Sequence, residues 1–550
     1  MAGLQLARNP WQAAWVGSRL LPRRVASVVG RRARGPLSVV ASAAAGERER
    51  SRRALRAELS GARGRHAGRL LAAAAATGEA LPSSVSAPAR GGTAAYLAYA
   101  AGDVSRAQQA LVGDRSPLAG VHRRWLAGER AVLQGNVLDT PRPRVTARAG
   151  SAGGVVHLVT NSLPEVQAGY TLRTRGIVGA QQAAGLDVHV CTPPGFPVAQ
   201  GRLAAEPFVT VDGVPHHRTL RRGLPLGRPD ELLEAYAASA AALAARVGAS
   251  VLHAHSKHVN AQAALVAGAR LGLPVVYEVR GFLEDTWRTR GGRADSDFYG
   301  WTRATETRCM REATAVVTLS QSMRDDIVAR GIDPGAIHVV GNCVPDDHVD
   351  NPVDRDGVRE RLAIGPDDVV VGTVSTLNDY EGIDVLLEAG ALVDSERLVV
   401  LVVGDGPALD DLTTLAAAHA RTSRTRFILT GRVPHELSRD HTAALDVFAL
   451  PRRRTPVTRL VAPLKPVTAM GLGVPVVGSD LPPIRELLSD GRGVLVPAAD
   501  ATALATAVRE LMDDPAGRKE LGEDARAHVR THLTWSAAAR SYRQIYEAAS

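Results

Sequence analysis

A chain of 550 residues is too long for one hydrophobic core, and 45% hydrophobic with 22% charged residues is typical of a globular protein with several domains. No apolar run approaches the roughly 18 residues that a membrane-spanning helix needs, which excludes an integral membrane protein. The three cysteines are widely spaced, which fits neither a disulfide framework nor a zinc site and favours the reducing cytoplasm.

The net charge of +10 is concentrated at the N-terminus. Residues 1–66 hold 14 arginines and three glutamates, and the rest of the chain is close to neutral, so no nucleic-acid partner is expected. Trp11 and Trp15 lie one helical turn apart among arginines, which indicates an interfacial helix on an anionic membrane. The alternative is a solvated basic tail or a helix that packs on its own protein.

Residues 93–135 are predicted to form a helical hairpin. Alanines recur along the segment and Gly102-Asp103 interrupts it, as in one unit of a tetratricopeptide-like array. Because such arrays need about three units to be stable, we interpret the hairpin as a cap on the main body. Residues 1–150 are therefore expected to form an Arg-rich helical N-terminal extension.

Beyond residue 150, apolar strands alternate with helices, which predicts an α/β fold with parallel sheets. One series fills residues 151–348 and a second fills residues 349–534, followed by a C-terminal helix at 535–550. We expect two Rossmann-like domains that face each other across a cleft. Ligands in such folds lie beyond the carboxyl ends of the strands.

Candidate catalytic residues of the first series lie at strand ends. Gly169 begins a helix, where a glycine lets an anion approach the backbone amides, although an ordinary turn is the alternative. Glu278 and Arg280 end another strand, and a structural ion pair is their alternative. His253 and His255 flank one alanine and are expected to point to opposite faces, with His255 toward the cleft. We therefore expect no metal site at this pair.

The stretch from Asp446 to Glu486 predicts an anion site. A buried strand leads into a basic loop that carries Arg459 and Lys465, and Pro466 then opens a short helix. Free backbone amides and the positive end of that helix favour phosphate oxygens. A nucleoside diphosphate fits an anion site made of a basic loop and a helix N-terminus.

Two other strand ends of the second series are candidate donor-binding segments. Ser375 ends the first strand of this series. Gly431, Arg432 and Val433 end a later one, where backbone groups are expected to contact a planar base. The turn at residues 404–407 is interpreted as structural.

Six segments occur in the order found in one enzyme family: SLPEVQAGYTLRTRGIVGAQQAAGLDVHVCTPPGFP, VLHAHSKHVNAQAAL, VVYEVRGFLEDTW, AVVTLSQSMRDDIVARGI, VVGDGPALDDL and PLKPVTAMGLGVPVVGSDLPPIREL. Through them, roughly residues 155 to 550 resemble the GT-B-fold glycosyltransferases of family 4. The members of this family are retaining enzymes that use nucleotide sugars.

The resemblance implies sugar transfer without a bound metal or other cofactor. Gly169 would approach the donor phosphates and the acceptor, while Lys465 and the amides after Pro466 would hold the diphosphate. Residues 431–433 would lie near the base. Thr468 stands where the family contacts the donor ribose.

The sequence also departs from the family pattern. The two glutamates usual around the Ala-Met helix are replaced by Leu460 and Thr468. The usual histidine of the first domain corresponds to Arg280, and the usual Arg and Lys at the first junction of the second domain correspond to residues 375–376 and Glu381. The alternative is therefore a non-catalytic glycosyltransferase-like protein that binds a nucleotide or a partner enzyme.

We expect a cytoplasmic, retaining hexosyltransferase-type enzyme of cell-surface glycan or glycoconjugate biosynthesis. Its partners would be a nucleotide sugar and a glycan, lipid-linked or small-molecule acceptor. Residues 1–66 would hold it at the inner membrane face.

Overall fold

The computed structural model describes residues 91–139, 154–200, 205–220 and 227–549, with short pieces between residues 27 and 74. The segment around Trp11 and Trp15 lies outside the described residues. In the described part of the leader, α4 (Pro36–Ala44) shares an apolar cluster with Leu97 through Val39. None of the helices in the described ranges is long and apolar enough to cross a bilayer.

The first domain contains an eight-stranded sheet in the order β3-β4-β2-β1-β5-β6-β7-β8. All neighbouring strands are parallel except the hairpin β3–β4, which the sequence did not suggest. The strands are β1 (Gly154–Leu158), β2 (Val188–Thr192), β3 (Phe208–Val211), β4 (Val214–Arg218), β5 (Ala249–His255), β6 (Val275–Val279), β7 (Ala315–Thr318) and β8 (Ile337–Val339).

Helices cover both faces of this sheet. Their apolar side chains meet the strands, whose central members β1, β5, β6 and β7 are buried almost throughout, as in doubly wound folds. These helices are α10 (Gly169–Ala183), α11 (Pro229–Val247), α12 (His258–Leu271), α13 (Leu283–Thr289), α14 (Asp297–Glu312) and α15 (Gln321–Ala329).

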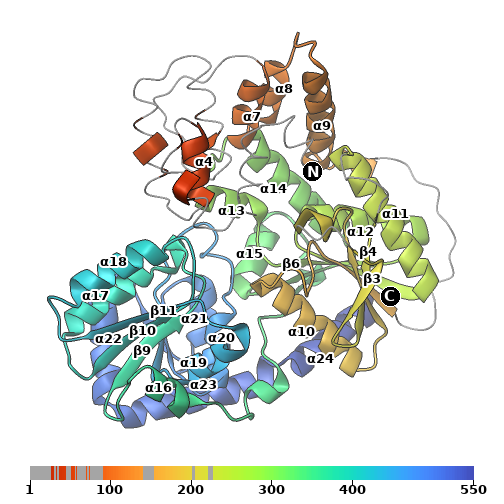
Figure 1. Ribbon diagram of the computed structural model, residues 1–550. Helices are drawn as coiled ribbons and strands as arrows, with labels where there is room; N and C mark the ends of the chain where they lie inside the picture. Colours follow the sequence, from red (N-terminus) through yellow and green to blue (C-terminus); the bar gives the residue numbers. More distant parts are fainter. Residues whose placement is uncertain are drawn as a thin grey trace.

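The predicted hairpin of the extension is wrong in one respect, because the segment forms three helices. These are α7 (Gly92–Ala100), α8 (Val104–Ala110) and α9 (Pro117–Leu133). Gly102-Asp103 separates the first two as expected, and Ser116 caps the third by accepting a hydrogen bond from a backbone amide. The helices pack on α11 and α14, so the extension does cap the first domain (Figure 1).

The second domain contains a six-stranded, fully parallel sheet in the order β11-β10-β9-β12-β13-β14. Its strands are β9 (Val369–Val374), β10 (Leu398–Val403), β11 (Arg426–Gly431), β12 (Val447–Leu450), β13 (Val476–Ser479) and β14 (Val494–Val496). Its helices are α16 (Arg355–Arg361), α17 (Ile383–Val393), α18 (Leu409–His419), α19 (Ser438–Ala443), α20 (Lys465–Gly471), α21 (Pro482–Leu488), α22 (Ala501–Asp513) and α23 (Pro515–His532). The predicted α/β fold with two Rossmann-like domains is confirmed.

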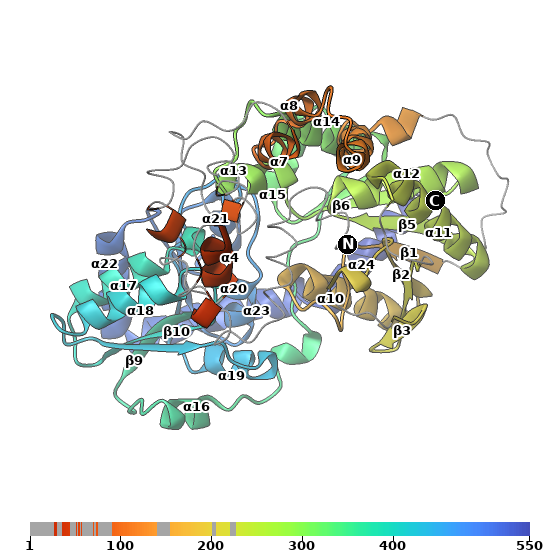
Figure 2. The same ribbon diagram turned by 45° about the horizontal axis from the view of Figure 1, so that its top comes forward.

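The last helix, α24 (Trp535–Ala549), returns from the second domain to the first (Figures 1 and 2). It packs along α10, and Trp535 and Tyr542 join the core beneath β1 and β5. A Cβ atom at Gly176 would collide with the indole of Trp535, so only glycine permits this close approach. The chain therefore crosses between the domains twice.

Candidate active site

A cleft of about 950 Å³ separates the two domains and is lined by residues of both. Its walls are the carboxyl ends of the two parallel sheets, where ligands of doubly wound folds bind. Of the residues singled out in the sequence, Gly169 and Arg280 line it from the first domain. Those that line it from the second domain are Ser375, Arg432, Val433, Lys465 and Thr468.

Lys465 is the central cation on the second-domain wall. Its Nζ donates to Ser375 Oγ at 2.7 Å and to Glu381 Oε1 at 3.3 Å. Burial lowers the pKa of the Lys465 ammonium, while the neighbouring Glu381 carboxylate opposes this shift. The ammonium group of Lys465 is therefore held in one position by Ser375 and Glu381.

A buried ion pair supports Lys465 from behind. Arg452 grips both carboxylate oxygens of Glu381 at 3.0 Å, and the two side chains are 9% and 4% exposed. Burial alone would raise the pKa of Glu381, but Arg452 and then Lys465 outweigh it, so this pKa lies below its usual value. Two cations thus share one acid, so the group formed by Arg452, Lys465 and Glu381 carries a net charge of +1.

Helix α20 places Lys465 at its first position and Pro466 at its second. Pro466 is buried and is not among the described residues that line the cleft, so its part is to shape the helix start. Thr468 faces the cleft, and its carbonyl oxygen accepts a hydrogen bond from His348 Nε2 at 3.1 Å.

The turn at residues 404–406, interpreted above as structural only, also lines the cleft. Gly404 has φ +141°, and a Cβ atom there would overlap the carbonyl oxygen of Ser375. Only glycine fits this approach, which brings Asp405 into the cleft wall. Gly431, by contrast, is not among the described residues of the lining, although Arg432 and Val433 after it are.

The basic loop before α20 is anchored on the first domain. Leu460, at a position where the family keeps a glutamate, packs against the first domain's core, and its carbonyl oxygen accepts from Ser320 Oγ at 3.1 Å. Asn342 Nδ2 donates to the carbonyl oxygen of Ala462 at 2.9 Å. Arg459 is exposed and does not belong to the described lining of the cleft.

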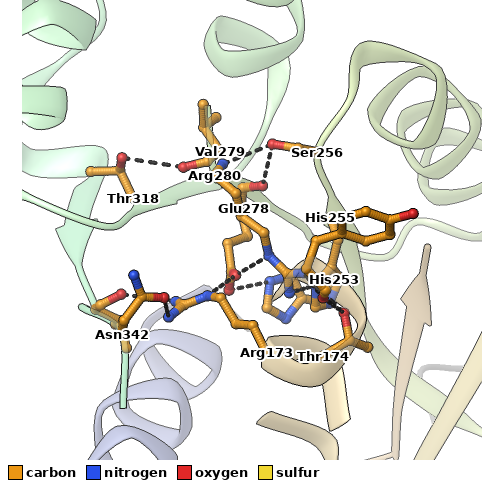
Figure 3. Close-up of polar contacts among 12 residues, drawn as sticks. Arg173, Thr174, His253, His255, Ser256, Glu278, Val279, Arg280, Thr318 and Asn342 are labelled. Atoms are coloured by element: carbon orange, nitrogen blue, oxygen red, sulfur yellow. Dashed lines mark hydrogen bonds and ion pairs between the residues drawn. The ribbon is translucent and has the colours of Figure 1, made fainter. Parts of the chain in front are cut away.

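Arg280 connects the first-domain wall with the start of α10 (Figure 3). Its Nη1 donates to the carbonyl oxygen of Tyr170 at 2.8 Å and to Thr174 Oγ1 at 2.9 Å. Beside this contact, no atom outside the immediate chain lies within 4 Å of a Cβ built on Gly169. The backbone at Gly169 therefore faces open space in the cleft.

Glu278 lies beneath the cleft and is not among its described lining residues. It is fully buried and accepts from Arg280 Nε at 2.6 Å and from Arg173 Nε at 3.0 Å (Figure 3). The hydroxyl of Tyr542 also donates to it. Burial would raise the pKa of Glu278, but Arg173 and Arg280 hold it well below its usual range. Glu278 is thus a permanent anion that holds two guanidinium groups.

The expectation that His253 and His255 point to opposite faces is wrong. Residues two apart in a strand share a face, and the two rings stack at 4.4 Å between centroids. They are buried together with His157 of β1, and one ligand atom from each of the three lies within 4.8 Å of the others. His255 is not among the described residues of the cleft lining.

This cluster has the residue types of a metal site, but five of its six ring nitrogen atoms are already hydrogen-bonded, and His253 Nε2 is the one that is not. Arg280 Nη2 donates to His255 Nδ1, and His255 Nε2 lies 2.8 Å from His157 Nδ1. A metal ion would need these lone pairs and would meet the Arg280 cation. The arrangement fits a hydrogen-bonded support better than a metal centre.

Two Rossmann-like domains with a lysine-centred site in the cleft between them have the architecture of the GT-B glycosyltransferases. Two family models match the protein, "Glycosyl transferase 4-like domain" over residues 168–343 and "Glycosyl transferases group 1" over residues 368–514, together more than half of the chain. The chain belongs to the GT-B glycosyltransferases of the family 4 type, which confirms the resemblance drawn from the sequence.

Relatives and solved structures agree with this assignment. Alpha-D-kanosaminyltransferase of Streptomyces kanamyceticus is 27% identical over 54% of this chain and 77% of its own length. Alpha-maltose-1-phosphate synthase of Mycolicibacterium smegmatis is 26% identical over 64% of this chain and 93% of its own. The structure of Anabaena Alr3699/HepE in complex with UDP superposes with a TM-score of 0.57 at 16% identity, and covers 72% of this chain and 99% of that one.

Proposed function

We propose that the protein transfers a sugar, with retention of configuration, from a nucleoside-diphosphate donor bound in the cleft to an acceptor hydroxyl. The observation that carries this proposal is the position of Lys465 in the same cleft as Gly169 and Arg280 of the other domain. A diphosphate between them meets fixed cations and open backbone. Such preorganised charge stabilises the departing diphosphate and needs no metal or other cofactor.

Within this proposal the second domain holds the donor. Lys465 offsets part of the negative charge of the diphosphate, and Ser375 orients the Lys465 ammonium. Arg432 and Val433 flank the base, and Thr468 lies nearest the ribose. Pro466 and Gly431 shape the backbone around them. Arg459, which is exposed away from the cleft, is left out of the donor site.

The acceptor is proposed to be a glycan, a lipid-linked sugar or a small molecule in the biosynthesis of a cell-surface glycan or glycoconjugate. The relatives' names, a kanosaminyltransferase and a maltose-1-phosphate synthase, support sugar transfer to varied acceptors. UDP bound to the Anabaena neighbour supports a nucleoside diphosphate as the leaving group.

A panel of nucleotide sugars tests the proposal. We expect calorimetric binding of at least one nucleoside diphosphate, together with donor consumption that is stimulated by an acceptor and unchanged by a metal chelator. Proton NMR of the anomeric centre at early times reports whether configuration is retained. Inversion would overturn the retaining mechanism, and metal-dependent turnover would overturn the metal-free one.

A non-catalytic protein is the second candidate, and one observation favours it. Leu460 and Thr468 replace the family's glutamates, and Leu460 is used for packing between the domains. In the same panel of nucleotide sugars, nucleotide binding without consumption of any donor, even with acceptors present, would support the non-catalytic function.

We further propose that the enzyme is cytoplasmic and bound to anionic membrane through residues 1–66. Deleting these residues is expected to abolish co-sedimentation with vesicles that contain phosphatidylglycerol, because the deletion removes a net charge of +11. Since α4 of the leader packs on Leu97, a second variant, Trp11→Ser with Trp15→Ser, leaves α4 in place. Vesicles of phosphatidylcholine alone are the control, and undiminished sedimentation of both variants would refute membrane binding.

A further inference from the structure

A chain of hydrogen-bonded side chains lies beneath Arg280, in the core of the first domain, and an ion-pair contact between His253 and Glu278 leads it back to the same arginine. Its members come from β1, β5, the end of β6, α10 and α24, and all but Arg280 are at most 5% exposed. In order, they are Arg280, His255, His157, Gln181, Tyr546, His253 and Glu278.

Arg280 fixes which atoms donate and which accept in the first half of the chain, from Arg280 to Gln181. A guanidinium only donates, so His255 Nδ1 must accept and the proton of this imidazole must sit on Nε2. His255 Nε2 then donates to His157 Nδ1 at 2.8 Å, which places the proton of His157 on its own Nε2. That Nε2–H donates to Gln181 Oε1 at 2.9 Å.

The second half of the chain leads from Gln181 through Tyr546, His253 and Glu278 to Arg280. Gln181 Nε2 donates to the Tyr546 hydroxyl at 2.9 Å, so this hydroxyl donates in turn to His253 Nδ1 at 2.7 Å. The proton of His253 is left on Nε2, which lies 3.5 Å from Glu278 Oε2 in an ion-pair contact and has no hydrogen-bond partner among the described residues. Glu278 Oε1 accepts from Arg280 Nε and closes the chain.

The imidazoles of His255 and His157 are neutral and carry their proton on Nε2. A second proton on His255 or His157 would set two donors against each other. Burial, the largest influence on all three rings, also lowers their pKa values, which agrees with neutral histidines.

We propose that this chain is a positioning device for Arg280, and that Tyr546 of the C-terminal helix is the residue that closes it. The inference rests on the proposed function, in which Arg280 faces the donor and acceptor across from Lys465. Arg280 also holds the first two turns of α10 through Tyr170 and Thr174, so its position sets that of Gly169 as well. Tyr546 acts through other side chains and does not itself touch substrate.

An apolar core would be the simpler way to stabilise this sheet, because buried polar groups are costly to desolvate unless every one is paired. The polar chain differs from an apolar core because each of its hydrogen bonds can be made with only one assignment of donor and acceptor. This assignment leaves Arg280 Nη1 free to donate to α10 at the cleft.

Tyr546→Phe tests the proposal, with Gln181→Met as a second break in the same chain from a different helix. We expect kcat for sugar transfer to fall between about 10- and 100-fold with little change in KM for the donor, because a misplaced Arg280 is still present. Tyr236→Phe is the matched control, since it removes a buried tyrosine hydroxyl that donates only to backbone carbonyl oxygens of Val159 and Cys191.

Nitrogen-15 NMR supplies a readout that does not depend on activity. In the wild type, the Nε–H signal of Arg280, assigned with Arg280→Lys, is expected to be sharp and slow to exchange. The three imidazoles are expected in the Nε2–H form. Tyr546→Phe and Gln181→Met should broaden or shift the Arg280 signal, and Tyr236→Phe should not.

The outcomes separate this inference from the proposed function. An unchanged Arg280 signal in both chain variants, an imidazole protonated on Nδ1, or stoichiometric Zn²⁺ binding by the three histidines would overturn it. Wild-type kcat in a variant whose Arg280 signal is broadened would also overturn the positioning role. If the wild type transfers no sugar from any donor, the proposed function fails, while the NMR comparison still decides whether the chain holds Arg280.

Discussion

Lys465→Ala is expected to lower kcat/KM for the nucleotide sugar by roughly 100- to 1,000-fold, because it removes the cation that we propose stabilises the leaving diphosphate. The fold should survive the change, since Arg452 keeps both of its bonds to Glu381. Steady-state kinetics of donor consumption and calorimetric titration with the nucleoside diphosphate measure the effect.

The small number of lysines provides a clean control. Lys519 of α23 is exposed and pairs only with Glu523 one turn further along the helix. Lys519→Ala is expected to retain wild-type kinetics and binding. If Lys465→Ala also retains them, Lys465 has no part in holding the donor.

Glu278→Gln is expected to lower the free energy of unfolding at pH 7 by about 3–5 kcal/mol, because it leaves two buried guanidinium groups without their anion. Glu278 is fully buried, and the side chains of Arg173 and Arg280 are 3% and 9% exposed. Guanidinium chloride unfolding of the intact chain, followed by tryptophan fluorescence, measures the change.

The pH dependence of this effect has a definite sign. Because the folded-state pKa of Glu278 lies well below its usual value of about 4.5, the ionised carboxylate stabilises the fold above that pH. This contribution is lost as the pH falls through the lower folded-state value. The difference between Glu278→Gln and the wild type should therefore be largest near neutral pH and shrink in acid.

Glu306→Gln is the matched control, because Glu306 is equally buried but lacks an arginine partner of this kind. Burial is the main cause that raises its pKa to about 7, and Tyr277 and the amide of His258 donate to it. A group with a raised carboxyl pKa gives up stability as the pH rises, so neutralising it is expected to cost less than about 1 kcal/mol at pH 7. Equal losses from both substitutions would show that the charge of Glu278 is not what matters.

The sheets were predictable because their strands are nearly continuous apolar runs, the pattern of parallel strands buried on both faces. The hairpin β3–β4 escaped detection because β3 alternates between exposed and half-buried residues and resembles surface chain. The third helix of the extension was missed although Ser116-Pro117 is a standard start signal.

At the candidate active site, residues with a local sequence signal were predicted, whereas contacts between residues far apart in the sequence were not. Lys465 was found because a basic loop before a helix is an anion signal within a few residues. The ion pair between Arg452 and Glu381 joins positions 71 residues apart. No sequence pattern near either residue indicates this pairing. The shared face of His253 and His255 could have been deduced from strand periodicity, but the arrival of Tyr546 beside them depends on the course of the whole chain.

The return of α24 makes the second domain an insertion in the first. Val344, where the chain leaves the first domain, bridges in parallel to Thr534, where it comes back. Val344 N donates to the carbonyl oxygen of Leu533 at 2.9 Å, and Trp535 N donates to that of Val344 at 3.0 Å. The second domain therefore leaves and rejoins the first domain at a single place in the structure. A foreign domain grafted between these ends would leave the sheet of the first domain, α24 and Tyr546 within the host chain, and would have to replace the contact that Leu460 makes with the first domain's core.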